Sequence, residues 1–139
     1  MIKTKWVPTI EHETVLISFN EMDAQIDIEL APIILWLWKQ GIETTYCCQG
    51  YRGEQGADRW ERVAPGAYIS FAPGNHASRF VKALVAIGFP ENIMSTVFNS
   101  DPDMWHWECK YNSCGDFSFV CRFPNKDISE IVNLLISNK

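Results

Sequence analysis

The chain alternates between short apolar runs, which are typical of strands, and longer stretches in which apolar residues recur every three or four positions. The strand-like runs are Val15 to Phe19, Thr44 to Cys48, Ala67 to Phe71, Ile93 to Phe98, Trp105 to Lys110 and Phe117 to Phe123. The last two runs alternate strictly between apolar and polar residues. They therefore predict an antiparallel hairpin with one buried face.

Three amphipathic or largely apolar stretches predict helices. The first covers residues 30–41, accepts Pro32 in its first turn and ends at Gly41. The second follows Asn75, a predicted N-cap, and the third begins with Asp127 and Glu130, which have the spacing of a capping box. The order βαββαβββα predicts an α+β fold: a single-domain, two-layer sandwich with three helices on one face of a mixed or antiparallel sheet.

Composition limits the class of protein. A chain of 139 residues that is 47% hydrophobic and 21% charged has the size and core of one domain, residues 1–139. The net charge of -5 argues against tight non-specific binding to nucleic acid. No apolar run approaches a membrane span, and no secretory signal is visible at the N-terminus, so we expect a cytoplasmic protein with no membrane partner. Five cysteines, an odd number, then indicate reduced thiols.

The segment that follows Cys48 is the strongest indication of a functional site. Residues 51–66 are polar, rich in glycine and longer than an ordinary connection between two strands. Three of the five arginines lie there beside a tyrosine and a tryptophan, a composition suited to an anionic or planar ligand. The alternative is a solvated loop whose acidic residues neutralise these arginines. The predicted ligand-binding residues are Cys48, Gln49, Tyr51, Arg52, Arg59, Trp60 and Arg62.

Catalysis and metal binding have weaker support. Cys48 ends a predicted strand, but no histidine lies near it in the sequence, so no nucleophile and base pair is evident. The cysteines form no C-x2-C pair, which structural zinc sites normally contain. If a metal site exists, its predicted ligands are Cys48, His106, Cys109 and Cys114. A second alternative is acid–base chemistry by His106 and Glu108, which share one face of a predicted strand.

One resemblance rests on about 20 residues from Leu30 to Gly50. The motifs that carry it are Ala31-Pro32, Gly41-Ile42-Glu43-Thr44 and Cys47-Cys48-Gln49-Gly50. This stretch looks like short phage and prophage proteins of uncharacterised role that carry a helix, a G-I-x-T strand and a C-C-G-H-G motif. The chain has Tyr51 where that family has histidine. The resemblance implies a viral setting, in which such a protein would sequester a host signalling nucleotide as an anti-defence activity.

A second resemblance starts from residues 44–50, Thr-Thr-Tyr-Cys-Cys-Gln-Gly, and from the strand, helix and Gly-Phe turn of residues 68–89. Both are similar to the wybutosine-synthesis tRNA methyltransferases, which carry a T-x-S-C-S-G-R motif followed by the same layout. This resemblance implies binding of S-adenosylmethionine and modification of a tRNA base near the loop that follows Cys48.

The sequence thus favours a small phage-type protein that binds a nucleotide-like ligand without catalysis and without a cofactor. The first alternative is an S-adenosylmethionine-dependent, tRNA-modifying enzyme. The second is a protein interaction module that uses exposed tryptophans, of which the chain has six. A homodimer is a further expectation, because tryptophan-rich strands and a largely apolar helix leave apolar surface to be covered.

Overall fold

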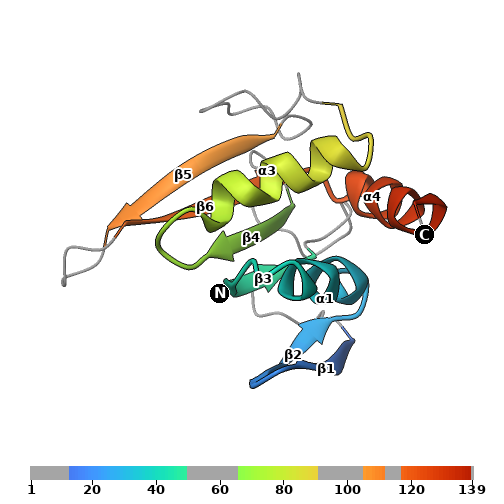
Figure 1. The fold of residues 1–139 in the computed structure, drawn as a ribbon, viewed down its shortest axis with the longest axis horizontal. Coiled ribbons are helices and arrows are strands. Elements are labelled where there is room, and N and C mark those ends of the chain that lie inside the picture. The colour runs from blue at the N-terminus through green and yellow to red at the C-terminus, as the bar shows by residue number, and fades with distance from the viewer. Residues whose placement is uncertain (1–12, 50–65, 91–104, 112–116, 139) are drawn as a thin grey trace, which may run out of the picture.

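The computed structural model describes residues 13–49, 66–90, 105–111 and 117–138. In chain order its elements are β1 (Thr14–Phe19), β2 (Met22–Asp27), α1 (Ala31–Lys39), β3 (Thr44–Cys48), β4 (Ala67–Phe71), α3 (His76–Ala86), β5 (His106–Tyr111), β6 (Phe117–Phe123) and α4 (Lys126–Ser137). Figure 1 shows these elements coloured along the chain. The predicted strand at residues 93–98 and the loop at residues 51–65 lie outside the described residues.

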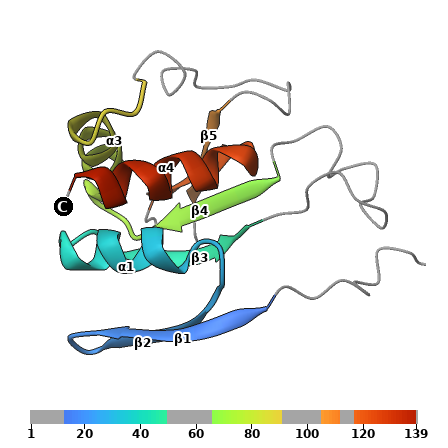
Figure 2. The same ribbon diagram turned by 90° about the vertical axis from the view of Figure 1, so that its right-hand side faces the viewer.

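The described strands form two antiparallel sheets. One has four strands in the order β3-β4-β6-β5, and the other is the β1–β2 hairpin. The three described helices lie on one side of the four-stranded sheet, with α1 between this sheet and the hairpin (Figures 1 and 2). The predicted α+β class with three helices and antiparallel pairing is therefore confirmed. We call the surface of the four-stranded sheet on which the described helices lie the helix side. The opposite surface is the helix-free side.

Strand β2 of the hairpin is present in the structure but absent from the predicted order of elements. Its inward residues are Met22, Ala24 and Ile26, which alternate with outward polar residues, so its periodicity is that of a strand but its apolar signal is weak. The turn before it places Asn20 at a φ of 57°, a left-handed conformation that asparagine tolerates well. The sequence pattern was too polar for the strand to be recognised.

The core lies between the helices and the helix side of the four-stranded sheet. In α1 the buried side chains are Ala31, Ile33, Ile34, Leu37 and Trp38. An aromatic cluster extends this core, because Trp105 stacks on Phe123 with ring centroids 4.6 Å apart and also lies against Phe89 and Phe80. None of the helices in the described residues is long and apolar enough to cross a membrane.

Pro32 in the first turn of α1 and Asn75 as the N-cap of α3 are confirmed, whereas the capping contacts of α3 and α4 differ from those predicted. Gly41 follows α1 with a φ of 77°, as predicted for a glycine that ends a helix. Asn75 does precede α3, but its side chain makes no capping hydrogen bond. The predicted capping box at Asp127 is wrong, because Asn125 is the N-cap of α4 and the Asp127 carboxylate accepts a hydrogen bond from Trp105 Nε1 at 2.8 Å.

Candidate functional site

Strand alternation places a row of polar residues across the helix-free side of the sheet. In register, Cys48 of β3 lies opposite Tyr68 of β4, Tyr68 opposite Arg122 of β6, and Arg122 opposite His106 of β5. Their neighbours along the strands point to the helix side, where Ile69 and Cys121 are fully buried. We call Cys48, Tyr68, Arg122 and His106 the polar row.

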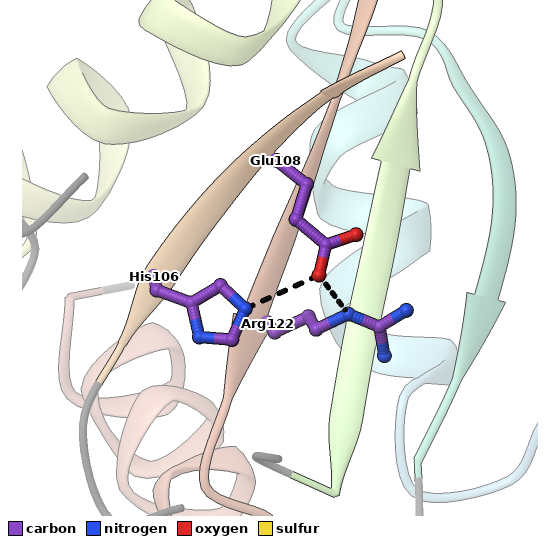
Figure 3. Close-up of polar contacts among 3 residues, drawn as sticks. All are labelled: His106, Glu108 and Arg122. Carbon is purple, nitrogen blue, oxygen red and sulfur yellow. Dashed lines mark hydrogen bonds and ion pairs between the residues drawn. The ribbon is translucent and has the colours of Figure 1, made fainter. Parts of the chain in front are cut away.

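A charged cluster occupies the β5 end of this row (Figure 3). Arg122 donates a hydrogen bond from Nε to Glu108 Oε2 at 2.8 Å, and His106 Nε2 lies 3.3 Å from the same oxygen. Burial opposes the charge of Glu108, but the hydrogen bonds from His106 and Arg122 and the nearby charges lower its pKa below the usual value. Glu108 is therefore the counter-ion of a buried arginine.

Arg122 also lies over an aromatic ring. Its guanidinium carbon is 5.2 Å from the centroid of the Tyr68 ring, a distance at which the cation is attracted to the π face. Burial raises the pKa of Tyr68, and the neighbouring Cys48 raises it further. Tyr46 lies on the same side of the sheet and is 74% exposed. The helix-free side thus combines a fixed guanidinium with two phenol rings.

A β-bulge in β3 fixes which residues share this side. The register shifts between Thr44 and Tyr46, so strict alternation fails at Thr45. Thr44 accepts a hydrogen bond from Trp38 of α1, whereas Thr45 bonds the hydroxyl of Ser70 on the helix-free side. Thr45 and Cys47 therefore lie on opposite sides of the sheet, although strict alternation would place them on the same side.

The adjacent cysteines Cys47 and Cys48 point to opposite sides of the sheet, as consecutive residues of a strand do. Cys47 lies opposite Ile69 and packs against the core, where burial raises its pKa to about 12, with further contributions from Asp27 and Cys48. Burial also raises the pKa of Cys121 well above its usual value. Both side chains are therefore neutral thiols near pH 7 and are poor nucleophiles.

The geometry brings His106 to Glu108 but not to Cys48. Cys48 and His106 are separated by three strand spacings, which is about 14 Å at roughly 4.8 Å per spacing, so they cannot form a nucleophile and base pair. Cys109 points to the helix side, away from His106. The three described members of the predicted metal set thus do not converge, and the fourth, Cys114, lies outside the described residues. Among the described residues no group of three or more potential metal ligands is present.

Gln49 is buried and connects three parts of the fold. Its backbone N–H donates to Asp27 at 2.9 Å, and its side-chain oxygen accepts from the backbone N–H of Glu29 at 3.0 Å. Asn125, at the start of α4, donates to the Gln49 carbonyl oxygen. Gln49 therefore anchors the end of β3 to the hairpin and to α4, in addition to the ligand contacts predicted for it.

Five of the predicted ligand-binding residues lie outside the described part of the chain: Tyr51, Arg52, Arg59, Trp60 and Arg62. The segment that carries them leaves β3 after Gln49 and returns at Gly66, two positions before Tyr68. The sequence therefore joins it to the β3–β4 end of the polar row.

Sequence analysis did not identify Tyr68, Arg122 or Tyr46 as site residues. Arg122 could have been predicted as a site residue, because it is a charged residue within the largely apolar strand Phe117–Phe123. Its neighbour Tyr68 depends on the pairing of β4 with β6, which sequence alone does not provide, whereas Glu108 lies on the other strand of the predicted hairpin, whose antiparallel pairing is confirmed.

We compared the chain with protein-family models, curated proteins and solved structures, and none of the three comparisons gave a match. The function is therefore inferred from the residues themselves.

Proposed function

We propose that the protein binds a nucleotide-like ligand on the helix-free side of the four-stranded sheet, at the β3–β4 end of the polar row, without catalysing a reaction on it. By the resemblance to phage proteins, the biological role is sequestration of a signalling nucleotide. The proposal keeps the ligand-binding segment expected from the sequence and adds Tyr46, Tyr68 and Arg122 to it.

The observation that carries the proposal is the contact of Arg122 with Tyr68. The guanidinium carbon lies 5.2 Å from the ring centroid, and an arginine beside an aromatic ring suits nucleobases and phosphates as ligands. Tyr46 adds an exposed ring on the same side, two positions along β3 from Cys48. Ring stacking of this kind tolerates any base, because every base has a π face.

Binding of a phosphate needs more positive charge than the described part of the site provides, and the segment at residues 50–65 carries it in the sequence. Glu108 already balances Arg122, so the described part of the site contributes little net positive charge toward a phosphate. The further cations required are Arg52, Arg59 and Arg62, which the sequence joins to the same end of the row. The proposal therefore divides the site into stacking by the sheet and phosphate binding by the arginines.

The separation and burial of the reactive groups support binding without catalysis. Within the described residues the thiol of Cys121 is buried, that of Cys47 is half-buried against the core, and Cys48 is far from His106. The His106 ring is 5% exposed and faces a carboxylate that also binds Arg122. A base that must accept a proton from a ligand needs access to it, and this arrangement instead stabilises charge.

The test is native mass spectrometry and calorimetric titration with cyclic and adenine-containing nucleotides and with S-adenosylmethionine. We expect a nucleotide to bind and to be recovered intact. Replacing both Arg52 and Arg59 by alanine should abolish binding while the melting temperature stays within a few degrees. Tight binding of S-adenosylmethionine would instead favour the methyltransferase-like alternative.

A matched pair of tyrosine substitutions tests whether the site lies on the helix-free side of the sheet. Tyr46 is 74% exposed on the helix-free side, and Tyr111 is 67% exposed on the helix side. Tyr46→Ala should weaken binding about tenfold, the loss expected for one stacking contact, whereas Tyr111→Ala should leave it unchanged. Equal effects of the two substitutions, or no binding by the wild-type protein, would contradict the proposal.

A further inference from the structure

Helix α1 carries apolar residues on two of its faces. The face toward the core is buried and includes Ile33, Ile34, Leu37 and Trp38. A second face runs through residues 32, 35, 36, 39 and 40, which have the spacing of neighbours on one side of a helix. This face presents Leu35 and Trp36, both partly buried, where a surface helix usually carries polar residues. The second face therefore has apolar surface beyond what the core uses.

The second face of α1 forms a groove with α4. The groove has a volume of about 580 Å³, and every residue that lines it belongs to the described part of the chain. Beside Leu35 and Trp36, α4 contributes Val132, Leu135 and Ile136, which also share one side of their helix. Figure 2 shows the two helices next to each other. We call this feature the α1–α4 groove, and most of its wall is aliphatic or aromatic.

The polar residues of the α1–α4 groove lie where its two helices end. Lys39 and Gln40 are the last residue and the C-cap of α1, and Asn138 is the C-cap of α4. Both helices end on the side of the molecule where the C-terminus is marked in Figure 2. The groove thus combines an apolar length with one polar end.

Lys39 gives the α1–α4 groove a positive formal charge. None of its lining residues, all of them described, is acidic, and Lys39 makes no ion pair within the described part of the chain. A helix C-terminus opposes an anion with about half a negative charge. At α1 Arg79 offsets this charge, because its guanidinium donates to the carbonyl oxygens of Gln40 and Gly41 at 2.6 and 3.0 Å. The ammonium group of Lys39 can therefore pair with an anionic ligand.

We propose that the α1–α4 groove binds an amphipathic monoanion, with an aliphatic chain along Trp36 and Leu135 and a carboxylate paired with Lys39. At about 1.5 Å per residue, the face from residue 32 to residue 39 is about 10 Å long, the length of an extended chain of about eight to ten carbons. The volume is about four times that of a cavity of roughly 150 Å³ that holds benzene, so such a chain fits. This site is separate from the proposed nucleotide site, which lies on the helix-free side of the sheet.

The first experiment is calorimetric titration with decanoate and with decanol, its neutral counterpart of the same chain length. We expect one decanoate per chain, bound about fivefold more tightly than decanol, the gain expected for an ion pair with an exposed lysine. Lys39→Gln should remove this preference by weakening decanoate about fivefold while leaving decanol unchanged. The control Lys126→Gln, an exposed lysine at the other end of α4 and outside the groove, should keep the preference.

The second experiment changes the apolar wall of the groove. Ile136 is 61% exposed, so Ile136→Glu should fold, and by placing a carboxylate beside the chain it should weaken decanoate at least about tenfold. The matched change Val85→Glu, on α3 at 40% exposure and outside the groove, should leave binding unchanged. If Ile136→Glu does not fold, the comparison of Lys39→Gln with Lys126→Gln decides.

Four outcomes would overturn the proposal. They are a wild-type protein that does not bind decanoate, equal losses from Ile136→Glu and Val85→Glu, equal losses from Lys39→Gln and Lys126→Gln, and a Lys39→Gln variant that loses decanol as much as decanoate. An amphipathic helical peptide that binds the groove when neither decanoate nor decanol does would assign it to a protein partner instead.

Discussion

The two sides of the four-stranded sheet use the same strands for different purposes. In β6, Cys121 and Phe123 point to the helix side and are fully buried, while Arg122 between them points to the helix-free side. In β4, Ile69 and Phe71 are likewise buried at 0% exposure, while Tyr68 belongs to the polar row. One residue in each strand therefore serves the core and the next serves the candidate site.

The comparison shows that the site is held in place by the core without being part of it. Side chains on the helix side interlock with three helices, so the backbone positions on the helix-free side are fixed by packing on the opposite surface. Substitutions on the helix side should therefore change stability most. Substitutions on the helix-free side should act mainly on charge and binding.

The largest expected effect comes from the helix side. Phe123 is fully buried and stacks on Trp105, so Phe123→Ala should lower the free energy of unfolding by about 3 to 5 kcal/mol, measured by urea denaturation. Phe117→Ala is the matched control, since Phe117 lies in the same strand and on the same side but is 55% exposed. Phe117→Ala should lower the free energy of unfolding by less than about 1 kcal/mol. Equal losses would show that the aromatic core is not where the fold's stability lies.

A smaller effect should come from Gln49, the buried polar residue at the end of β3. Gln49→Ala removes the acceptor of the Glu29 N–H and the 3.5 Å contact to the Glu29 carboxylate. Leaving a partly buried N–H without this acceptor should cost about 1 to 3 kcal/mol in the same urea assay. Gln25→Ala, whose exposed side chain bonds Thr14, should change stability by less than about 0.5 kcal/mol. If Gln49→Ala is equally neutral, the anchor between β3 and the hairpin is unimportant.

Most of the fold follows from local pattern. The strands β3, β4 and β6 have the predicted bounds, because apolar and β-favouring residues alternate within them and glycine or proline lies near their ends. The two places where the structure differs from the predicted elements both involve polar residues. In β2 the inward Ala24 is small and Asp23 and Asp27 are of a type depleted in strands, so the strand signal is weak. At Asp127 the carboxylate accepts a hydrogen bond from Trp105 across the fold in place of capping its own helix.

The site was predictable only in part, for a topological reason. Cys48 and His106 could be identified from the sequence because each is a polar or reactive residue at a distinctive position in its strand. Their separation could not, because it depends on the strand order β3-β4-β6-β5, which places two strands between them. The pairing of Arg122 with Glu108 instead lies within the β5–β6 hairpin, which the alternating pattern predicts, although the pattern does not fix its register. Side-chain chemistry is local, whereas the distances between groups are set by pairings remote in sequence.

The smallest effect, and the most specific to the helix-free side, should come from Glu108. Its lowered pKa means that the folded protein favours the charged carboxylate, so its contribution is fully present above the unfolded-state value near 4.5 and is lost as the pH falls below it. Because Glu108 is 37% exposed, Glu108→Gln should cost only about 1 kcal/mol at neutral pH. That difference from wild type should shrink as the pH falls below 4.5 and Glu108 becomes protonated, as followed by urea midpoints. Glu130→Gln, on the exposed surface of α4, should track the wild-type curve throughout. A deficit of Glu108→Gln that persists unchanged in acid would mean that the carboxylate acts through shape or neutral hydrogen bonding, and that charge does not hold Arg122 over Tyr68.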